Sequence, residues 1–274
     1  MPGKTTSKRA PTRTIHHRVT APRSHKAGTR PGMHRASAVT QAGTTTHFRV
    51  SYVTSLGQEG ADLAGAILQT CEQDYNTLSG IFGGLTPEAL PFVVEITSDN
   101  TGASHSSCMG TDISIGGKSG SNVDFIRSLL VAEEDEVFMA NFGHGWNCGA
   151  SNGEGLSRVL ADDIYKNVEP ADFISSNVWL NLDPRPDYVD ETEPTDTDYN
   201  SIGCSVLFLN WLRSQLNYSW QQIVDAGTAT LARTYTNLTG KNTAWQDFEA
   251  VINAHFPLGQ QYNLDTDNPF PVAG

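Results

Sequence analysis

Electric charge divides this chain into two unlike parts at about residue 49. Residues 1–49 hold ten of the 18 Lys and Arg residues and none of the 30 Asp and Glu residues, so the remainder carries a net charge of −22. The first 46 residues also contain four prolines and no long apolar run, and such a segment cannot bury enough apolar surface to fold. The sequence therefore predicts a disordered basic tail over 1–46 and a single domain over 47–274.

The composition of the tail leaves its role open. It lacks the apolar stretch of about 7–15 residues that a secretory signal needs, and no later segment is long and apolar enough to cross a bilayer, which indicates a soluble protein of undetermined compartment. The tail fits an organelle transit peptide, a nucleic-acid-binding arm, a solvated tail, or sequence upstream of a true start at Met33. Because the acidic domain repels phosphate, we expect nucleic acid to bind weakly and only through the tail.

Four cysteines are spread through the domain without a closely spaced pair. Cys71, Cys108, Cys148 and Cys204 form no C-x-x-C, so they indicate neither a zinc ribbon nor a dithiol redox motif. Two disulfides and four buried thiols are both compatible with this number of cysteines.

Hydrophobic periodicity predicts strands first and helices afterwards. Alternating β-branched and aromatic residues indicate strands at 47–53, 91–97 and 111–115. Apolar residues spaced three and four apart indicate helices at 59–82, at 121–140, from 151 onward, and at 202–216, 220–226 and 243–255. Loops are expected at 98–110 and at the acidic segment 183–198. This order predicts an α+β fold, with a small N-terminal sheet and packed helices followed by a mostly helical C-terminal half.

The stretch Ala132-Glu133-Glu134-Asp135-Glu136 places four acidic residues in a row on one predicted helix. Glu133 and Glu136 share the helix face of the apolar residues, whereas Glu134 and Asp135 lie further round and are expected to be solvated. Burying an ionised carboxylate costs several kcal/mol unless it is paired or bound to a cation. Glu133 and Glu136 are therefore candidate functional residues.

This arrangement resembles the gluzincin type of zincin metallopeptidase. In that family the active-site helix bears H-E-x-x-H, whose two His residues bind zinc and whose Glu acts as general base. The matching stretch here keeps the Glu as Glu133 but has Ala132 and Glu136 at the His positions. The resemblance implies a zincin-like fold, Glu154 in N-G-E-G-L as a further metal ligand and Tyr199 as an oxyanion-stabilising residue. It also implies a divalent metal, zinc in that family, and a peptide or protein substrate.

Each of these acidic residues has a second interpretation. Glu154 lies three residues after Ser151, as in a helix capping box, and four before Arg158, as in a helical ion pair. Glu133 and Glu136 can be structural groups that pair with arginines or backbone donors.

The missing first histidine leaves two functional hypotheses open. Ala132 offers no ligand atom, and three protein ligands are the norm for a catalytic zinc. His144 is a candidate substitute ligand, although its glycine-rich loop also fits a turn or packing role, and Tyr199 also fits a packed aromatic. The domain is either a metallopeptidase-like hydrolase with an altered, carboxylate-rich site that suits hard cations, or a catalytically inactive zincin-like scaffold that acts as a binding or structural module.

Overall fold

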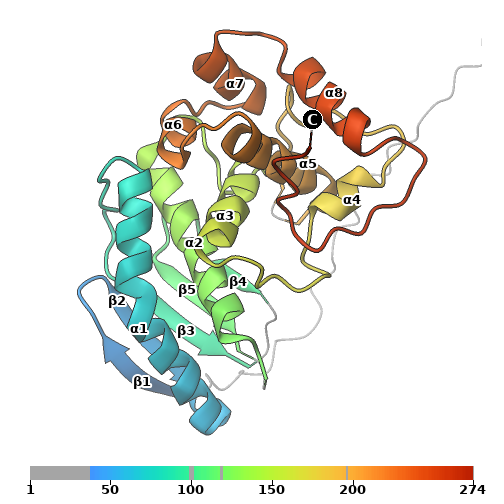
Figure 1. Ribbon diagram of the computed structural model, residues 1–274. Coiled ribbons are helices and arrows are strands. Elements are labelled where there is room, and N and C mark those ends of the chain that lie inside the picture. Colours follow the sequence, from blue (N-terminus) through green and yellow to red (C-terminus); the bar gives the residue numbers. More distant parts are fainter. Residues whose placement is uncertain (1–37, 99–101, 118–119, 196, 274) are drawn as a thin grey trace, which may run out of the picture. The chain divides into compact units, whose positions relative to one another are not determined.

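A mixed sheet of five strands forms the N-terminal part of the domain (Figure 1). The computed structural model describes residues 38–98, 102–117, 120–195 and 197–273. The strands lie in the order β1-β2-β3-β5-β4, with bounds β1 Val39–Thr44, β2 Phe48–Val53, β3 Phe92–Thr97, β4 Ala103–His105 and β5 Asp112–Gly116. β2, β3 and β5 are parallel, and the edge strands β1 and β4 run antiparallel to their neighbours.

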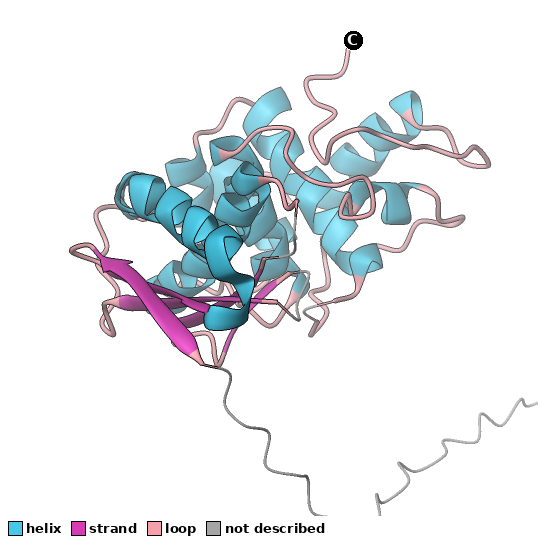
Figure 2. Cartoon of the chain, turned by 90° about the horizontal axis from the view of Figure 1, so that it is seen from below, coloured by secondary structure: helices cyan, strands magenta, loops and turns pink. Residues whose placement is uncertain are grey.

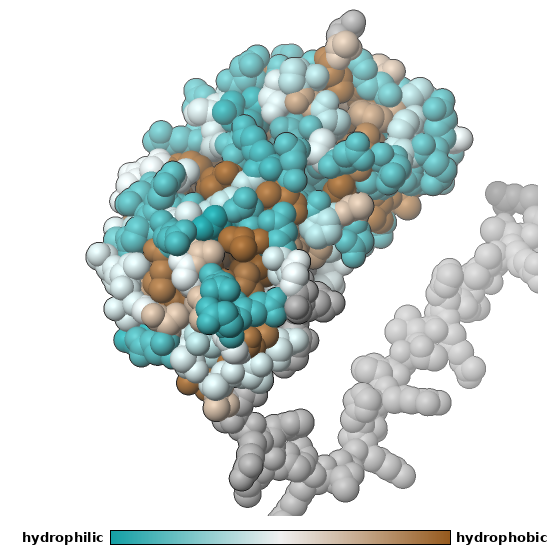
Figure 3. All heavy atoms as spheres, turned by 60° about the horizontal axis from the view of Figure 1, so that its bottom comes forward, coloured by the Kyte–Doolittle hydropathy of each residue, from teal (hydrophilic) through white to brown (hydrophobic). Residues whose placement is uncertain are grey.

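The sheet has one apolar face and one face of mixed character. The residues that point to the core are almost fully buried: Phe48, Val50, Phe92, Val94, Ile96, Ile113 and Ile115. The residues between them are more exposed, as expected for strands with a period of two. Figure 2 shows the helices gathered on one side of the sheet. On the face drawn in Figure 3, apolar residues lie in several separate groups among polar ones.

Three helices build the part of the core that carries the acidic stretch. α1 (Gly57–Ile81) follows β2, α2 (Val123–Phe142) follows β5, and α3 (Ser151–Ile164) comes next, after a short η1 turn (Thr54–Leu56) ahead of α1. α1 ends before Gly83 and Gly84, whose φ angles of 70° and 86° suit glycine. α2 contacts α1, α3, β4 and β5. Protein therefore encloses α2 on several sides, and little of it faces solvent.

The C-terminal half is helical and packs around aromatic side chains. Its elements are α4 Ser176–Leu180, α5 Tyr199–Asn210, the π-helical η2 Trp211–Gln215, α6 Trp220–Asp225, α7 Leu231–Thr239 and α8 Ala244–His255. The ring of Phe248 lies with its centroid 5.8 Å from Trp179 and 5.2 Å from Phe208. The segment after α8 returns to α4, where the Asp267 carboxylate accepts the N–H of Ser176 at 2.7 Å. None of the helices in the described ranges has both the length and the apolar character that a membrane span requires.

The α+β class and the predicted elements between 47 and 255 are confirmed, and two edge strands are corrections. Residues 39–44, expected in the disordered tail, form β1 and pair with β2; residues 103–105, expected in a loop, form β4. Backbone pairing rather than side-chain burial stabilises β1, so a hydrophobic pattern does not reveal it. The rest of the predicted tail, residues 1–37, lies outside the described residues.

Deletion of residues 1–44 is expected to destabilise the domain relative to deletion of residues 1–37. The longer deletion removes β1 and leaves one edge of β2 without its backbone partners. Each lost hydrogen bond is worth about 0.5–1.5 kcal/mol net, so we expect a loss of about 2–4 kcal/mol in the free energy of unfolding. Urea denaturation of the two truncated proteins measures the difference. Equal denaturation midpoints would show that β1 contributes nothing to stability.

Candidate functional site

The predicted acidic residues meet at a cavity of about 440 Å³ that β4, α2, α3 and the start of α5 line. Glu133 and Glu136 reach it from α2, Glu154 from α3 and Tyr199 from α5. Ala132, at the position of the first family histidine, also lines this cavity. Residues far apart in the sequence thus line one cavity.

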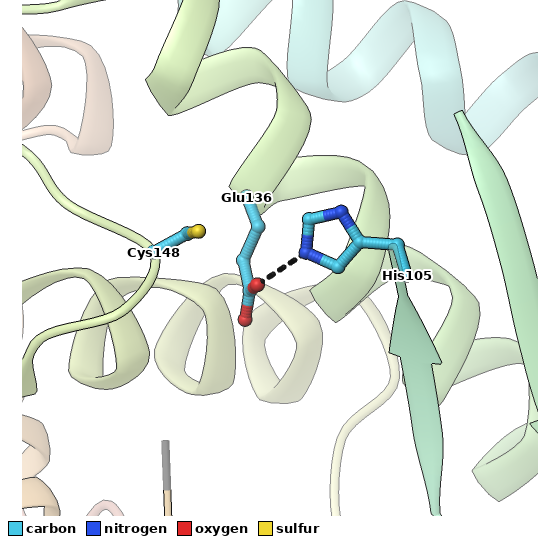
Figure 4. Close-up of side chains that lie close together, drawn as sticks. All are labelled: His105, Glu136 and Cys148. Carbon is cyan, nitrogen blue, oxygen red and sulfur yellow. Dashed lines mark hydrogen bonds and ion pairs between the residues drawn. The ribbon is translucent and has the colours of Figure 1, made fainter. Parts of the chain in front are cut away.

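His105 on β4 makes a short polar contact in the cavity. Its Nε2 lies 2.7 Å from a carboxylate oxygen of Glu136 (Figure 4). The same nitrogen lies 3.8 Å from a carboxylate oxygen of Glu133. Its Nδ1 lies 3.2 Å from the carbonyl oxygen of Gly110. With Nδ1–H donating to that carbonyl, the ring is fixed with Nε2 toward the two carboxyl groups. Sequence analysis did not select His105, because it ends a three-residue strand within a segment that looks like a loop.

Burial and mutual charge shift the proton equilibria of this cluster. Burial, followed by the charge of Glu136, raises the pKa of Glu133 to about 8, although His105 opposes the shift. Burial alone would lower the pKa of His105, but the hydrogen bond that its ring donates to Glu136 and the charges of both carboxylates outweigh this effect, so the pKa is raised. A pKa of about 8 keeps Glu133 mainly neutral near pH 7, and the neighbouring carboxyl groups favour the protonated form of His105.

A disulfide between Cys108 and Cys148 forms part of the cavity wall. Cys71 and Cys204 are buried free thiols, so the protein has one disulfide and two thiols rather than either arrangement expected from the sequence. Ligand atoms of His105, Glu136 and Cys148 lie within 4.8 Å of one another. A sulfur held in a disulfide is not a thiolate, so the oxidised protein offers two of these three atoms to a metal.

Two glycines place Glu154 at the cavity. The N-cap of α3 is Ala150, with no side-chain capping bond, so the predicted capping box of Ser151 and Glu154 is wrong. A Cβ atom on Gly153 would overlap the Asn147 carbonyl, and one on Gly155 would come within 2.6 Å of Cβ of Ser205. The glycines of N-G-E-G-L therefore let α3 pack against the 147–148 backbone and α5, and this close packing brings Glu154 to the cavity.

The expectation that Glu134 and Asp135 are solvated is wrong. Both side chains are 0% exposed, and their carboxyl oxygens have no hydrogen-bond partner among the described residues. Burial is the main cause that raises the pKa of each well above its ordinary value, with further contributions from Asp74 to Glu134 and from Glu136 to Asp135. The helix has no solvated face here, because α1, α3 and the sheet surround α2. Burial therefore favours the neutral, protonated form of both carboxyl groups.

The structure does not bring His144 to the cavity. It is an exposed residue with a φ of 56°, its ring lies 4.4 Å from that of Phe142, and its Nδ1 lies 3.2 Å from the carbonyl oxygen of Asp225. Its position fits the turn and packing interpretation.

Arg158 and Tyr199 form the cationic and aromatic part of the wall. The guanidinium carbon of Arg158 lies 4.8 Å from the ring centroid of Tyr199 and 5.0 Å from that of Phe173. Arg158 also donates a hydrogen bond to the carbonyl oxygen of Phe173 at 3.3 Å. These contacts hold a positive charge at the cavity wall, in place of the predicted pairing with Glu133 or Glu136.

The geometry of this cavity is the basis for assigning a function. No protein-family model, no curated protein and no solved structure matches the chain. The cavity presents one imidazole, three carboxyl groups, an aromatic hydroxyl and a guanidinium to a ligand. Such a set can bind a divalent cation and exchange protons with a substrate.

Proposed function

We propose that this domain is a metallopeptidase-like hydrolase of zincin-like fold with an altered site for a divalent cation. The observation that carries the proposal is the convergence of Glu133, Glu136, Glu154 and His105 on one cavity. A cluster of carboxyl groups in a partly buried position is costly unless a cation offsets the repulsion. The order of one strand, a helix, further strands, α2 and then α3 is the order that suggested the zincin family, and α3 packs against α2.

The chain provides a plausible set of ligands from its own residues. His105 Nε2 and carboxylate oxygens of Glu136 and Glu154 would hold the cation. The contact of Nδ1 with the carbonyl of Gly110 matches the way metal-binding histidines are commonly oriented. One nitrogen and several oxygen donors suit zinc and also harder cations such as manganese.

The remaining cavity residues would act on the substrate. A bound divalent cation supplies Lewis-acid polarisation of a carbonyl group. A positive charge in the cavity lowers the pKa of Glu133 from its metal-free value of about 8 toward the ionised form that a general base needs. Tyr199 and Arg158 lie on the wall where a hydroxyl and a guanidinium can stabilise a developing oxyanion.

Glu133→Gln is expected to lower peptide hydrolysis by about 100-fold or more, because it removes the general base and keeps the side-chain shape. The assay uses the unreduced full-length protein, labelled casein as substrate, and added Zn²⁺ or Mn²⁺. Glu249→Gln, at an exposed position on α8, is the matched control and should be unaffected. If neither cation raises hydrolysis above the rate of Glu133→Gln, the enzyme proposal is wrong.

A binding or structural scaffold is the second candidate, and two observations favour it. Ala132 contributes no ligand, and the sulfur nearest to His105 and Glu136 is blocked in a disulfide. The His105–Glu136 pair would then be a structural contact between β4 and α2. A hydrolysis assay that stays at background with every cation, in a folded protein, would leave this interpretation.

A further inference from the structure

We propose that reduction of the Cys108–Cys148 disulfide converts the cavity into a zinc site formed by Cys148, His105 and Glu136. The inference uses the cavity of the proposed function and rests on it in assigning a metal there, but it requires no hydrolysis. In the reduced protein the Cys148 thiolate would add a sulfur ligand to the imidazole and carboxylates of the cavity.

The three side chains already face one another. His105 comes from β4, Glu136 from α2 and Cys148 from the loop between α2 and α3, and Figure 4 shows them directed toward a common point. Their ligand atoms lie within 4.8 Å of one another. Two ligand atoms at about 2.0–2.3 Å from a tetrahedral zinc lie about 3.3–3.8 Å apart, so the side chains would approach one another by about 1 Å to close the site.

The polar surroundings fit a metal ligand set. His105 presents Nε2 to Glu136 while Nδ1 faces the Gly110 carbonyl, so a cation between Nε2 and the carboxylate would leave the second contact intact. Cys148 is 7% exposed and Glu136 is 8% exposed, so few water molecules compete for the ligands. Glu154 lines the same cavity, where a fourth position of the tetrahedron remains for it or for water.

Reduction of the disulfide makes the Cys148 sulfur available as a metal ligand. A dithiol reductant gives two electrons and two protons to the disulfide: the Sγ–Sγ bond breaks, Cys108 and Cys148 become thiols, and the reductant becomes a disulfide. Zinc then binds the Cys148 sulfur, and the thiol proton leaves to solvent. Both cysteines line the cavity, so a reductant has a path to the bond. Exchange with an oxidised dithiol, the reverse of this reaction, re-forms the Sγ–Sγ bond and removes the sulfur ligand.

Thiolate sulfur is the feature that makes the reduced site selective. Thiolates favour zinc over magnesium or calcium, whereas the carboxylates of the oxidised cavity do not discriminate in this way. Catalytic zinc sites have three protein ligands and one open position, whereas structural sites have four protein ligands. A Cys-His-Glu site therefore has the number of ligands of a catalytic site.

Two single substitutions separate the thiolate from the loss of the disulfide. Cys108→Ser and Cys148→Ser both remove the same cross-link, but only Cys108→Ser retains the proposed sulfur ligand. Zinc affinity is measured in the full chain with a phosphine reductant, by competition with a chromogenic chelator. We expect Cys108→Ser to bind zinc about 100-fold more tightly than Cys148→Ser. Loss of a residue that only supports a metal ligand already lowers metal affinity by about 10–100-fold, and loss of the ligand itself should lower it at least as much. Thermal melts establish that both variants are folded.

Further measurements decide the remaining points. Wild type should bind zinc tightly with reductant and weakly without it, and Cys108→Ser with cobalt(II) should show a sulfur-to-metal charge-transfer band that Cys148→Ser lacks. Equal affinities of the two variants, or no cobalt–sulfur band, would overturn the inference. If Cys108→Ser binds zinc as expected but no form of the protein hydrolyses casein, the proposed function fails and the zinc site stands.

Discussion

The double substitution Ala132→His with Glu136→His is expected to tighten zinc binding of the unreduced protein by about 1,000-fold. It recreates H-E-x-x-H, with two imidazoles one turn apart on α2, which is continuous through these positions. Both positions and Glu154 line one cavity of about 440 Å³, so the new rings have room and a third ligand is at hand. Loss of a residue that only supports a metal ligand already lowers metal affinity by about 10–100-fold. Replacing an alanine and a carboxylate with two imidazole ligands should change zinc affinity by more than this.

Calorimetric zinc titration without reductant measures this effect and keeps Cys148 out of the ligand set. The triple variant that adds Glu154→Gln is the control and should lose most of the gained affinity. A double variant that binds zinc no better than the parent, or a triple variant that binds as well as the double, would mean that α2 and α3 are not placed as in a zincin.

Gly153→Ala is expected to lower the free energy of unfolding by about 2–4 kcal/mol, as overpacking of a rigid contact does. The added Cβ would overlap the Asn147 carbonyl and lie 2.9 Å from the backbone nitrogen of Cys148. Backbone atoms cannot move aside as a flexible side chain can, so α3 or the 147–148 segment must shift. That segment also carries one end of the disulfide.

Gly65→Ala on α1 is the matched control for this prediction. A Cβ at Gly65 would meet nothing within 4 Å, and Ala is favoured over Gly in a helix by about 1 kcal/mol. Urea denaturation should therefore show opposite signs for the two substitutions. A neutral Gly153→Ala would show that the close approach of α3 to the 147–148 backbone is not required for the fold.

Local patterns in the sequence were sufficient for most of the regular elements, but not for the edge strands β1 and β4, and for part of the site. The spacing of apolar residues located α1 and α2, and the alternation in 91–97 located β3. Because Glu133 and Glu136 interrupt an apolar helix face, they could be identified as candidates for the cavity before its shape was known. These features depend on residues close together in the sequence, where helical and strand periods apply directly.

The remaining features depend on contacts between distant segments. Nothing in the spacing connects His105 with Glu136, or Cys108 with Cys148. The first pair forms only when β4 packs against α2, and the second only when the segment between β4 and β5 meets the loop after α2. A polar residue such as Asp135 suggests a solvated face, and only the surrounding elements show that α2 has none. Strand β1 escaped detection for a related reason, since its partner groups are backbone atoms.

The acidic stretch of α2 couples folding of the metal-free chain to proton exchange with the solvent. In the unfolded chain Glu133, Glu134 and Asp135 have ordinary pKa values of about 4 and are ionised near pH 7. In the folded chain burial raises the pKa of all three, that of Glu133 to about 8. Folding near neutral pH therefore takes up protons, and the free energy of unfolding falls as the pH rises from about 4 toward 8. The formal net charge of −12 counts all three groups as ionised, so the folded metal-free protein carries less negative charge than its composition suggests.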